Sequence, residues 1–147
     1  MDIRPYQADD RELCLDIMRG NTPEFFAPEE LAEFAEFLDD PGEYFVVEED
    51  GRTLACGGWA IKPDGTASLC WGMVVHTHHR RGIGSYLFRE RMRLIREDGT
   101  ASAVKLVTSQ HSRPFYERLG FTVTGIRPEG FAPGLDAVDM RWDRPVS

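Results

Sequence analysis

The sequence predicts a mixed α/β fold built from seven strands and four helices. Two observations carry this prediction: an apolar repeat with helical spacing that follows residue 30, and three strand-like segments joined by short turns in the middle of the chain. The order of elements is strand, two helices, three strands, helix, strand, helix and two strands, which is typical of one mixed domain. Because the chain has 147 residues, we expect a single domain over residues 1–147.

The first third of the chain predicts one strand and two helices. Residues 3–6 suit a short strand, and the two aspartates that follow offer an N-cap to a helix that ends at Gly20. A polar and aromatic loop covers residues 21–27. Pro28 suits the first turn of the second helix, whose apolar positions repeat at i, i+3, i+4 and i+7. These positions are Leu31, Phe34, Ala35 and Leu38.

The middle of the chain predicts an antiparallel meander. Strands are expected over residues 44–48, 53–61 and 67–75. An Asp-Gly pair separates the first two strands, and a Pro-Asp-Gly turn separates the second from the third. Connections this short join antiparallel neighbours.

The last third predicts the remaining helices and strands. A helix is expected over residues 82–97, a strand over 104–108 and a short helix over 112–119. Two closing strands are expected over residues 121–126 and 137–144, on either side of a loop rich in glycine and proline.

Charge and hydropathy exclude several classes of protein. The formal net charge is −8, which argues against a nucleic-acid binder. The sequence has no apolar run long enough to cross a bilayer, and its start lacks the apolar stretch of a signal peptide. We therefore expect a cytoplasmic protein with no nucleic-acid partner and no membrane partner.

The cysteines indicate neither a disulfide framework nor a metal site. Cys14, Cys56 and Cys70 are odd in number and show no C-x-x-C spacing. Each has apolar neighbours, so we expect reduced thiols that pack as small core residues. No metal site is predicted.

Basic residues concentrate in one segment of this acidic chain. Six arginines occur between residues 80 and 96, at positions 80, 81, 89, 91, 93 and 96. The last four fall within the predicted helix, where the favoured interpretation is a solvated face. The first two precede that helix and suit an anionic ligand.

The segment from Met73 to Ser85 predicts an anion site. A strand ends there, a basic loop with two glycines follows, and a helix begins at once. The first N–H groups of a helix lack partners and carry partial positive charge, and glycine lets the backbone approach a phosphate closely. A Rossmann fingerprint fails because Leu87 replaces its third glycine, and a P-loop fails because the loop has no lysine.

Two motifs resemble the GNAT superfamily of N-acetyltransferases. The pattern Gln/Arg-x-x-Gly-x-Gly/Ala matches His79-Arg80-Arg81-Gly82-Ile83-Gly84, with His79 in place of Gln or Arg. The segment from Phe115 to Phe121, Phe-Tyr-Glu-Arg-Leu-Gly-Phe, resembles the family's F-Y-x-x-x-G-F helix. Ser109 and Ser112 are mild departures from the residues common in the family.

This resemblance implies a fold, an activity and a ligand. The fold is a central, mostly antiparallel seven-stranded sheet flanked by four helices, and the activity is transfer of an acetyl group from acetyl-CoA to a primary amine. The backbone of the fourth strand pairs with the pantetheine arm, here through Met73 and Val75, and Gly72 suits either a bulge or a plain strand position. The coenzyme contacts implied by the motif are His79, Arg80, Arg81, Gly82, Ile83, Gly84 and Ser85.

The resemblance also implies catalytic roles. Tyr116 matches the position of the family's acid, which protonates the departing thiolate, and the Val75 amide would stabilise the oxyanion. The general base stays open, because the fourth strand lacks the Glu that many relatives carry there. His76 and His111 are the nearest candidates by sequence.

The acceptor is expected to bind between variable segments. The resemblance points to the loop 21–27, the second helix and the loop 127–136. An apolar pocket would be lined by aromatic side chains, whereas each of them taken singly is more typical of the core: Phe25, Phe26, Trp59, Trp71 and Phe131. The acidic composition favours a cationic small-molecule or peptide amine, and exposed edge strands are compatible with a homodimer.

Two other functions compete with the enzyme. A non-catalytic coenzyme A-binding module is favoured by the missing carboxylate on the fourth strand, whereas Tyr116 favours the enzyme. The interpretation as an unrelated nucleotide-binding protein is less favoured, because the loop lacks the third glycine of a Rossmann fingerprint and the lysine of a P-loop. Turnover of acetyl-CoA with a panel of amines would distinguish the acetyltransferase from the non-catalytic module.

Overall fold

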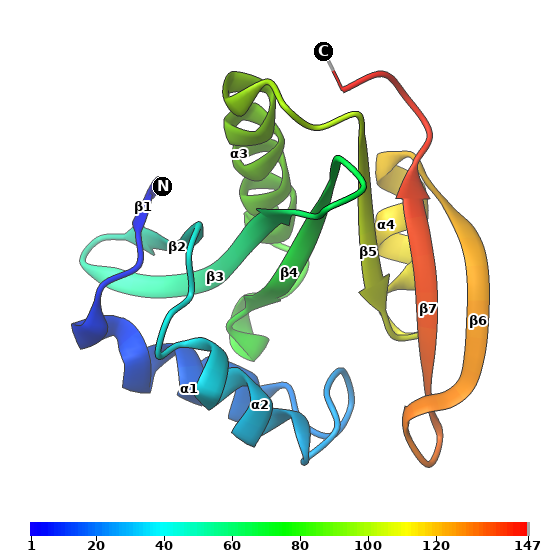
Figure 1. Ribbon diagram of the computed structural model, residues 1–147. Coiled ribbons are helices and arrows are strands. Elements are labelled where there is room, and N and C mark those ends of the chain that lie inside the picture. Colours follow the sequence, from blue (N-terminus) through cyan, green and yellow to red (C-terminus); the bar gives the residue numbers. More distant parts are fainter. Residues whose placement is uncertain (147) are drawn as a thin grey trace.

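One twisted sheet organises the protein, as the computed structural model shows for residues 1–146 (Figure 1). Its strands follow the order β1-β2-β3-β4-β5-β7-β6. The strands are β1 (Asp2–Pro5), β2 (Tyr44–Glu49), β3 (Arg52–Ile61), β4 (Thr66–Val74), β5 (Ala103–Thr108), β6 (Phe121–Ala132) and β7 (Leu135–Trp142). The helices are α1 (Arg11–Gly20), α2 (Glu30–Phe37), α3 (Ile83–Asp98) and α4 (Arg113–Leu119), with 3-10 turns at Ala8–Asp10 and His76–His78.

All strand pairs are antiparallel except β4 with β5, which confirms the predicted fold class. The parallel contact is short, because it joins only Thr66–Ser68 to Ala103–Lys105. Beyond Lys105, β5 keeps its antiparallel register with β7. The sheet is therefore held together on both sides of the point where β4 and β5 separate.

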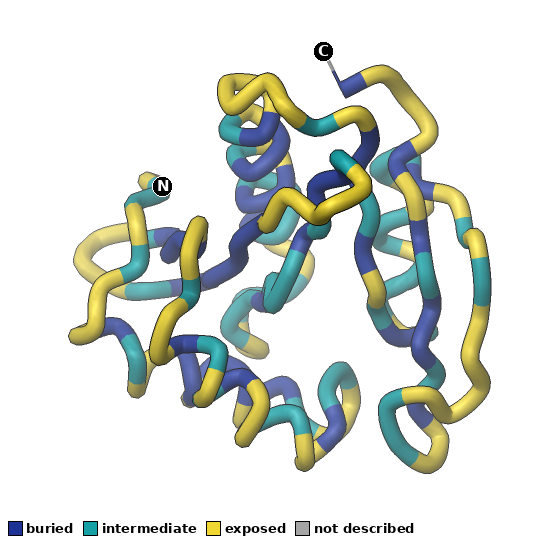
Figure 2. Tube along the Cα trace, in the orientation of Figure 1, coloured by how far each residue is buried: buried dark blue, intermediate teal, exposed yellow. Residues whose placement is uncertain are grey.

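Helices cover the two faces of the sheet with separate apolar clusters. On one face α1 and α2 pack over β2, β3 and the end of β4, through residues such as Met18, Phe34 and Tyr44. On the other face α3 and α4 pack over the centre of the sheet, where Phe88 and Met92 meet Leu106 and other buried residues. Figure 2 shows the buried positions along the central strands and the inner sides of the helices, whereas β6 is mostly exposed.

The last hairpin differs from its prediction. The strand expected over residues 121–126 continues to Ala132, and β7 begins at Leu135, so the expected loop 127–136 shrinks to a tight turn. Glu129 takes a left-handed φ of 52°. Its N–H donates to Asp136 Oδ1 at 2.9 Å, and its carboxylate accepts the Gly134 N–H at 2.7 Å. The segment rich in glycine and proline therefore forms an irregular part of the edge strand β6 and is not a loop.

The thiols lie where the sequence predicts. Cys14 and Cys56 are fully buried, Cys70 is half-buried, and all three are reduced. Burial raises the pKa of the Cys56 and Cys70 thiols. Within residues 1–146 no group of His, Cys, Asp and Glu side chains is arranged to hold a metal ion. No helix in that range is long and apolar enough to span a membrane.

A charged network ties the first strand to the first helix. The Arg4 guanidinium donates to both carboxylate oxygens of Asp10, at 2.7 and 2.8 Å, and its Nε donates to Glu48 on β2 at 2.6 Å. Asp10 is 4% exposed and also accepts the Gln7 N–H at 2.8 Å. The hydrogen bonds from Arg4 lower the pKa of the Asp10 carboxyl below its ordinary 3.8.

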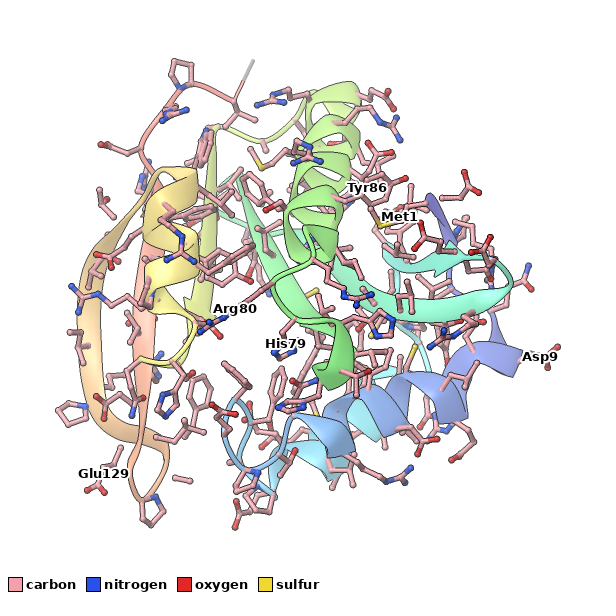
Figure 3. The ribbon with its side chains drawn as sticks, turned by 180° about the vertical axis from the view of Figure 1, so that it is seen from behind. Met1, Asp9, His79, Arg80, Tyr86 and Glu129 are labelled. Atoms are coloured by element: carbon pink, nitrogen blue, oxygen red, sulfur yellow. The ribbon has the colours of Figure 1, made fainter. Side chains whose placement is uncertain are left out.

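We expect Asp10→Asn to destabilise the fold by about 1.5–3 kcal/mol at pH 7, the range for hydrogen bonds to charged groups. Because the folded-state pKa of Asp10 is lowered, its contribution is present above the unfolded pKa and is lost as pH falls through the folded pKa. Urea unfolding at pH 7 and pH 3 measures the difference, which should shrink at the lower pH. Asp9→Asn, at the exposed neighbour labelled in Figure 3, is the control. A deficit that persists unchanged below pH 3 would contradict the assignment.

Candidate functional site

A bulge interrupts β4 halfway along its length. The register shifts so that Trp71 and Gly72 together stand opposite Gly57 of β3. Trp71 has a φ of 46°, a left-handed conformation that a bulky residue rarely adopts. The bulge that Gly72 suits is therefore present. It lies next to the place where β4 and β5 separate.

The edge of β4 that faces β5 has no strand partner beyond Ser68. The Val75 N–H donates to Leu54 O of β3 at 2.8 Å. Because backbone groups alternate in direction along an antiparallel strand, the N–H and C=O of Val74 point away from β3. The Val74 carbonyl accepts Asn21 Nδ2 at 2.9 Å and His79 Nε2 at 3.0 Å. The Val74 N–H is left as a donor on this edge.

This geometry corrects one prediction. Met73 and Val75 were the expected pairing residues, and the Val75 amide was the expected oxyanion donor. Met73 stands opposite Cys56, so by the same alternation its polar backbone groups face β3. The Val75 N–H is already engaged by Leu54. Sequence places these residues on one strand but cannot give the direction of their amides, because the direction depends on register.

The loop between β4 and α3 has the features of an anion site. Arg80 and Gly82 take left-handed φ values of 66° and 81°, and α3 begins at Ile83. The first bond into the helix runs from the Tyr86 N–H to Gly82 O at 3.0 Å. The N–H groups of residues 83–85 therefore lie before the first helical hydrogen bond. The predicted residues Ile83, Gly84 and Ser85 occupy this position.

Exposed positive charge lies beside these amides. Arg80 and Arg81 are exposed, and within residues 1–146 neither forms an ion pair. In Figure 3 the Arg80 side chain leaves the loop on the side of α4, while His79 stays near the end of β4. His79, which replaces the usual Gln or Arg of the motif, thus contacts the strand through its ring.

The two glycines of the loop have different roles. Gly82 has a positive φ and open space around the position of a Cβ. Gly84 has ordinary helical φ, and a Cβ there would lie 3.3 Å from the Phe115 ring and 3.8 Å from Val74 Cγ2. Gly84 therefore brings the start of α3 against both α4 and the end of β4.

Tyr116 follows Phe115 and is half-buried at the start of α4. Its ring lies 5.0 Å from that of Phe115 and 5.7 Å from that of Phe121, both edge to face. The contact between Phe115 and Gly84 brings this part of α4 to the same end of the sheet as the α3 start. The role of Tyr116 as an acid stays a prediction.

Histidines and the loop 21–27 meet at the end of β4. The Phe25 ring lies 5.3 Å from the His79 ring and 6.2 Å from the His111 ring. His76 lies 5.1 Å from His79 between ring centres, and its Nε2 is 3.9 Å from Glu24 Oε1. Both base candidates are thus exposed: His111 lies against the Phe25 ring, whereas His76 lies against His79.

Two further predictions need correction. Trp59 does not share a pocket with Trp71, because Trp59 packs under α3 in the main core while Trp71 packs under α2 on the opposite face. The expected solvated face of arginines on α3 holds for Arg93, which pairs with Glu90 and Glu97. It is wrong for Arg91, which is 2% exposed.

Sequence reasoning missed two polar residues that shape the site. Asn21, 3% exposed, donates through Nδ2 to Ile17 O at 2.8 Å as well as to Val74 O. Gln110 bridges the loop after β5 to the last hairpin, since it donates to Gly134 O at 2.7 Å and accepts the Asp136 N–H at 2.8 Å. An asparagine just after a helix-ending glycine is the one signal that could have drawn attention to Asn21.

Comparison with known proteins places this geometry among acetyltransferases. The sequence model of the acetyltransferase (GNAT) family matches residues 11–121. No curated protein matches the chain by sequence. Among solved structures, the ribosomal-protein-S18-alanine N-acetyltransferase from Escherichia coli is similar with a TM-score of 0.81 and 20% identity. This alignment covers 99% of this chain and 94% of that one.

Two further solved structures are similar over nearly all of both chains. Ard1 from Thermoplasma volcanium gives a TM-score of 0.82 at 21% identity, covering 99% of this chain and 97% of that chain. An aminoglycoside 6′-N-acetyltransferase complexed with coenzyme A gives 0.79 at 16% identity, covering 100% and 98%. At these identities the likeness shows a shared fold.

Replacing Asn21 tests how the end of β4 is held. We expect Asn21→Ala to lower stability by about 2 kcal/mol, because two carbonyls lose a buried donor. For a chain of this size this corresponds to a drop in Tm of about 4–8 °C by calorimetry. Asn21→Asp, nearly the same shape but with acceptors in place of the donor, should cost more. An Asn21→Ala variant as stable as the wild type would show that the bond to Val74 O contributes nothing.

Proposed function

The chain belongs to the GNAT family of acetyltransferases, and from this premise we propose that it transfers the acetyl group of acetyl-CoA directly to a primary amine of a small molecule or peptide. The observation that carries the proposal is the unpaired edge of β4, which leads into the free amides at the start of α3. An extended, amide-containing ligand with a phosphate end matches both features.

The residues present fit this ligand. The pyrophosphate would rest on the amides of residues 83–85, with charge-assisted hydrogen bonds from Arg80 and Arg81. The open space at Gly82 admits an anion close to the backbone. The pantetheine arm would lie along the edge of β4, where the Val74 N–H is the donor and the Val74 carbonyl is already satisfied by Asn21 and His79.

Two groups of the chain would assist the transfer of the acetyl group. When bound, acetyl-CoA supplies an activated thioester carbonyl. The Val74 N–H would donate to the carbonyl oxygen as it gains negative charge, in place of the Val75 amide. The Tyr116 hydroxyl would donate a proton at the sulfur, since a phenol can do so without being charged beforehand.

The amine must lose a proton before it attacks. An alkyl amine with a pKa of about 10.4 is neutral in only about one molecule in 10³ at pH 7. His76 and His111 are exposed bases near the end of β4, and each approaches the loop 21–27: the His111 ring lies 6.2 Å from the Phe25 ring, and His76 Nε2 lies 3.9 Å from Glu24 Oε1. Either could accept the proton directly or through water.

A cationic amine is the acceptor class that we propose. The net charge of −8 favours cations over anions near the protein. The structurally similar proteins include N-acetyltransferases named for an aminoglycoside and for the alanine of a ribosomal protein. Both names describe amine acceptors, one a small molecule and one a polypeptide, which supports the class without selecting between its two members.

The first test is binding of acetyl-CoA. We expect a micromolar Kd, so that ligand at about 100 times Kd stabilises the fold by about 2.7 kcal/mol and raises Tm by about 5–11 °C. A thermal-shift titration measures this change in Tm, and NAD, a dinucleotide, serves as the comparison ligand that should raise Tm far less. The double variant Arg80→Ala/Arg81→Ala should weaken the shift, whereas Arg93→Ala, on the exposed side of α3, should not. No shift at millimolar acetyl-CoA would refute the proposed ligand.

The second test concerns the proton donor. We expect Tyr116→Phe to lower kcat by about 10- to 1000-fold with little change in coenzyme affinity, because the ring packing survives and only the donor is lost. Free-thiol detection with a panel of primary amines gives kcat. Tyr86→Phe is the matched control, since its hydroxyl bonds Met1 O at 3.2 Å on another side of α3 (Figure 3). If the Tyr116→Phe variant keeps the wild-type kcat, water and not Tyr116 protonates the departing thiolate. Coenzyme binding without turnover in the wild type would favour the non-catalytic module.

A further inference from the structure

Arg91 is a buried cation without a counter-ion. It belongs to α3, is 2% exposed, and within residues 1–146 forms no ion pair. Its Nη1 donates to Gly58 O at 3.2 Å, and its Nε is fully buried with no hydrogen-bond partner. Burying a charge with so few partners is costly. A methionine would fill a similar volume without that cost, so packing alone does not account for an arginine here.

The guanidinium occupies a space that glycines leave open at the β4 bulge. A Cβ at Gly72 would lie 2.8 Å from Arg91 Nη2 and 3.1 Å from Nη1. A Cβ at Gly57, the residue opposite the bulge, would lie 3.3 Å from Arg91 Cζ. The guanidinium therefore sits where side chains of these two strand residues would otherwise be. A side chain at either glycine would compete with the guanidinium for the same space.

The opposite face of the bulge is also held. The Tyr44 hydroxyl donates to Trp71 O at 2.7 Å, and the Trp71 ring lies 5.2 Å from Phe34 and 6.1 Å from Phe37 of α2. A bulky residue with φ of 46° persists only where its surroundings enforce that conformation. Arg91 lies beside Gly72 on the α3 side of the bulge, and Tyr44 and α2 hold Trp71 on the other side.

We propose that Arg91 is a positioning residue for acetyl transfer, because it fixes the Trp71–Gly72 bulge and thereby the direction of the Val74 N–H. Gly72 lies two residues before Val74 on the same strand. A bulge that relaxes changes the register beyond it, and a shift of one residue reverses which amides face the edge. This inference rests on the proposed function, in which that edge holds the reacting thioester.

Kinetics of Arg91 variants provide the first test. We expect Arg91→Met to fold with a Tm equal to or above that of the wild type and to lose about 10- to 100-fold in kcat, with KM for acetyl-CoA changed less than about threefold. Arg91→Lys should lose less kcat than Arg91→Met, because the lysine ammonium keeps a positive charge and a hydrogen-bond donor. Arg89→Met, an exposed arginine of the same helix, is the control. A folded Arg91→Met variant with wild-type kcat would overturn the proposal.

A second variant covers the case in which Arg91→Met fails to fold. Gly72→Ala pushes the guanidinium from the strand side and should lower kcat in the same way. If both single variants fold, the double variant should be no slower than Arg91→Met alone, because the two changes act on one contact. Wild-type kcat in a folded Gly72→Ala variant, or full additivity of the two losses, would contradict a positioning role.

A readout without turnover separates this inference from the proposed function. Amide NMR shifts and hydrogen exchange at Trp71, Gly72 and Val74 report the bulge directly. We expect them to change in Arg91→Met and not in Arg89→Met. Unchanged amides would reject the inference even if the enzyme is active. Changed amides in a protein that never turns over would support the bulge contact and reject the acetyltransfer that it was proposed to serve.

Discussion

The structure depends on one strand edge that stays unpaired inside a sheet. Backbone N–H and C=O groups that lack partners are unfavourable when buried, so a sheet normally closes such an edge. Here β4 and β5 are parallel for three residues and then separate. The rest of the fold maintains that separation. Strand β7 pairs with the other side of β5, and the bulge interrupts the pairing of β4 with β3. The Val74 carbonyl, which points away from β3, accepts a hydrogen bond from the Asn21 side chain.

Three elements, α3, α4 and β4, meet at the end of the sheet where β4 and β5 have separated. The absent Cβ of Gly84 lets the Phe115 ring approach the first turn of α3, and the same point lies near the Val74 side chain. The proposed phosphate site and the packing of α4 thus share one residue. A substitution at Gly84 consequently changes the placement of α4 as well as the anion site, which makes Gly82, with open space around it, the cleaner position for studying the loop.

Much of the fold follows from local sequence pattern. Helical spacing from Leu31 to Leu38 and the two turns of the meander are local signals, and both elements form where expected. The loop between β4 and α3 was also predictable, because a strand end and glycines suffice to indicate a turn into a helix, and its binding of an anion stays a proposal. The direction of the Val74 amide was not predictable, because it depends on register across β3, and neither was the burial of Arg91. An arginine among other helix arginines looks solvated until two distant glycines are seen to receive it.

The double hydrogen bond of Asn21 has a consequence for how the binding of two ligands would be coupled. One amide joins the end of α1, where the loop 21–27 begins, to the strand proposed to carry the coenzyme. The loop also touches His79, which holds the same carbonyl from the other side. Two ligands that contact opposite ends of such a connection are thermodynamically linked, and each changes the affinity of the other by the same factor. The shared carbonyl thus couples the strand proposed to hold the donor to the loop proposed to hold the acceptor, and this coupling acts equally in both directions.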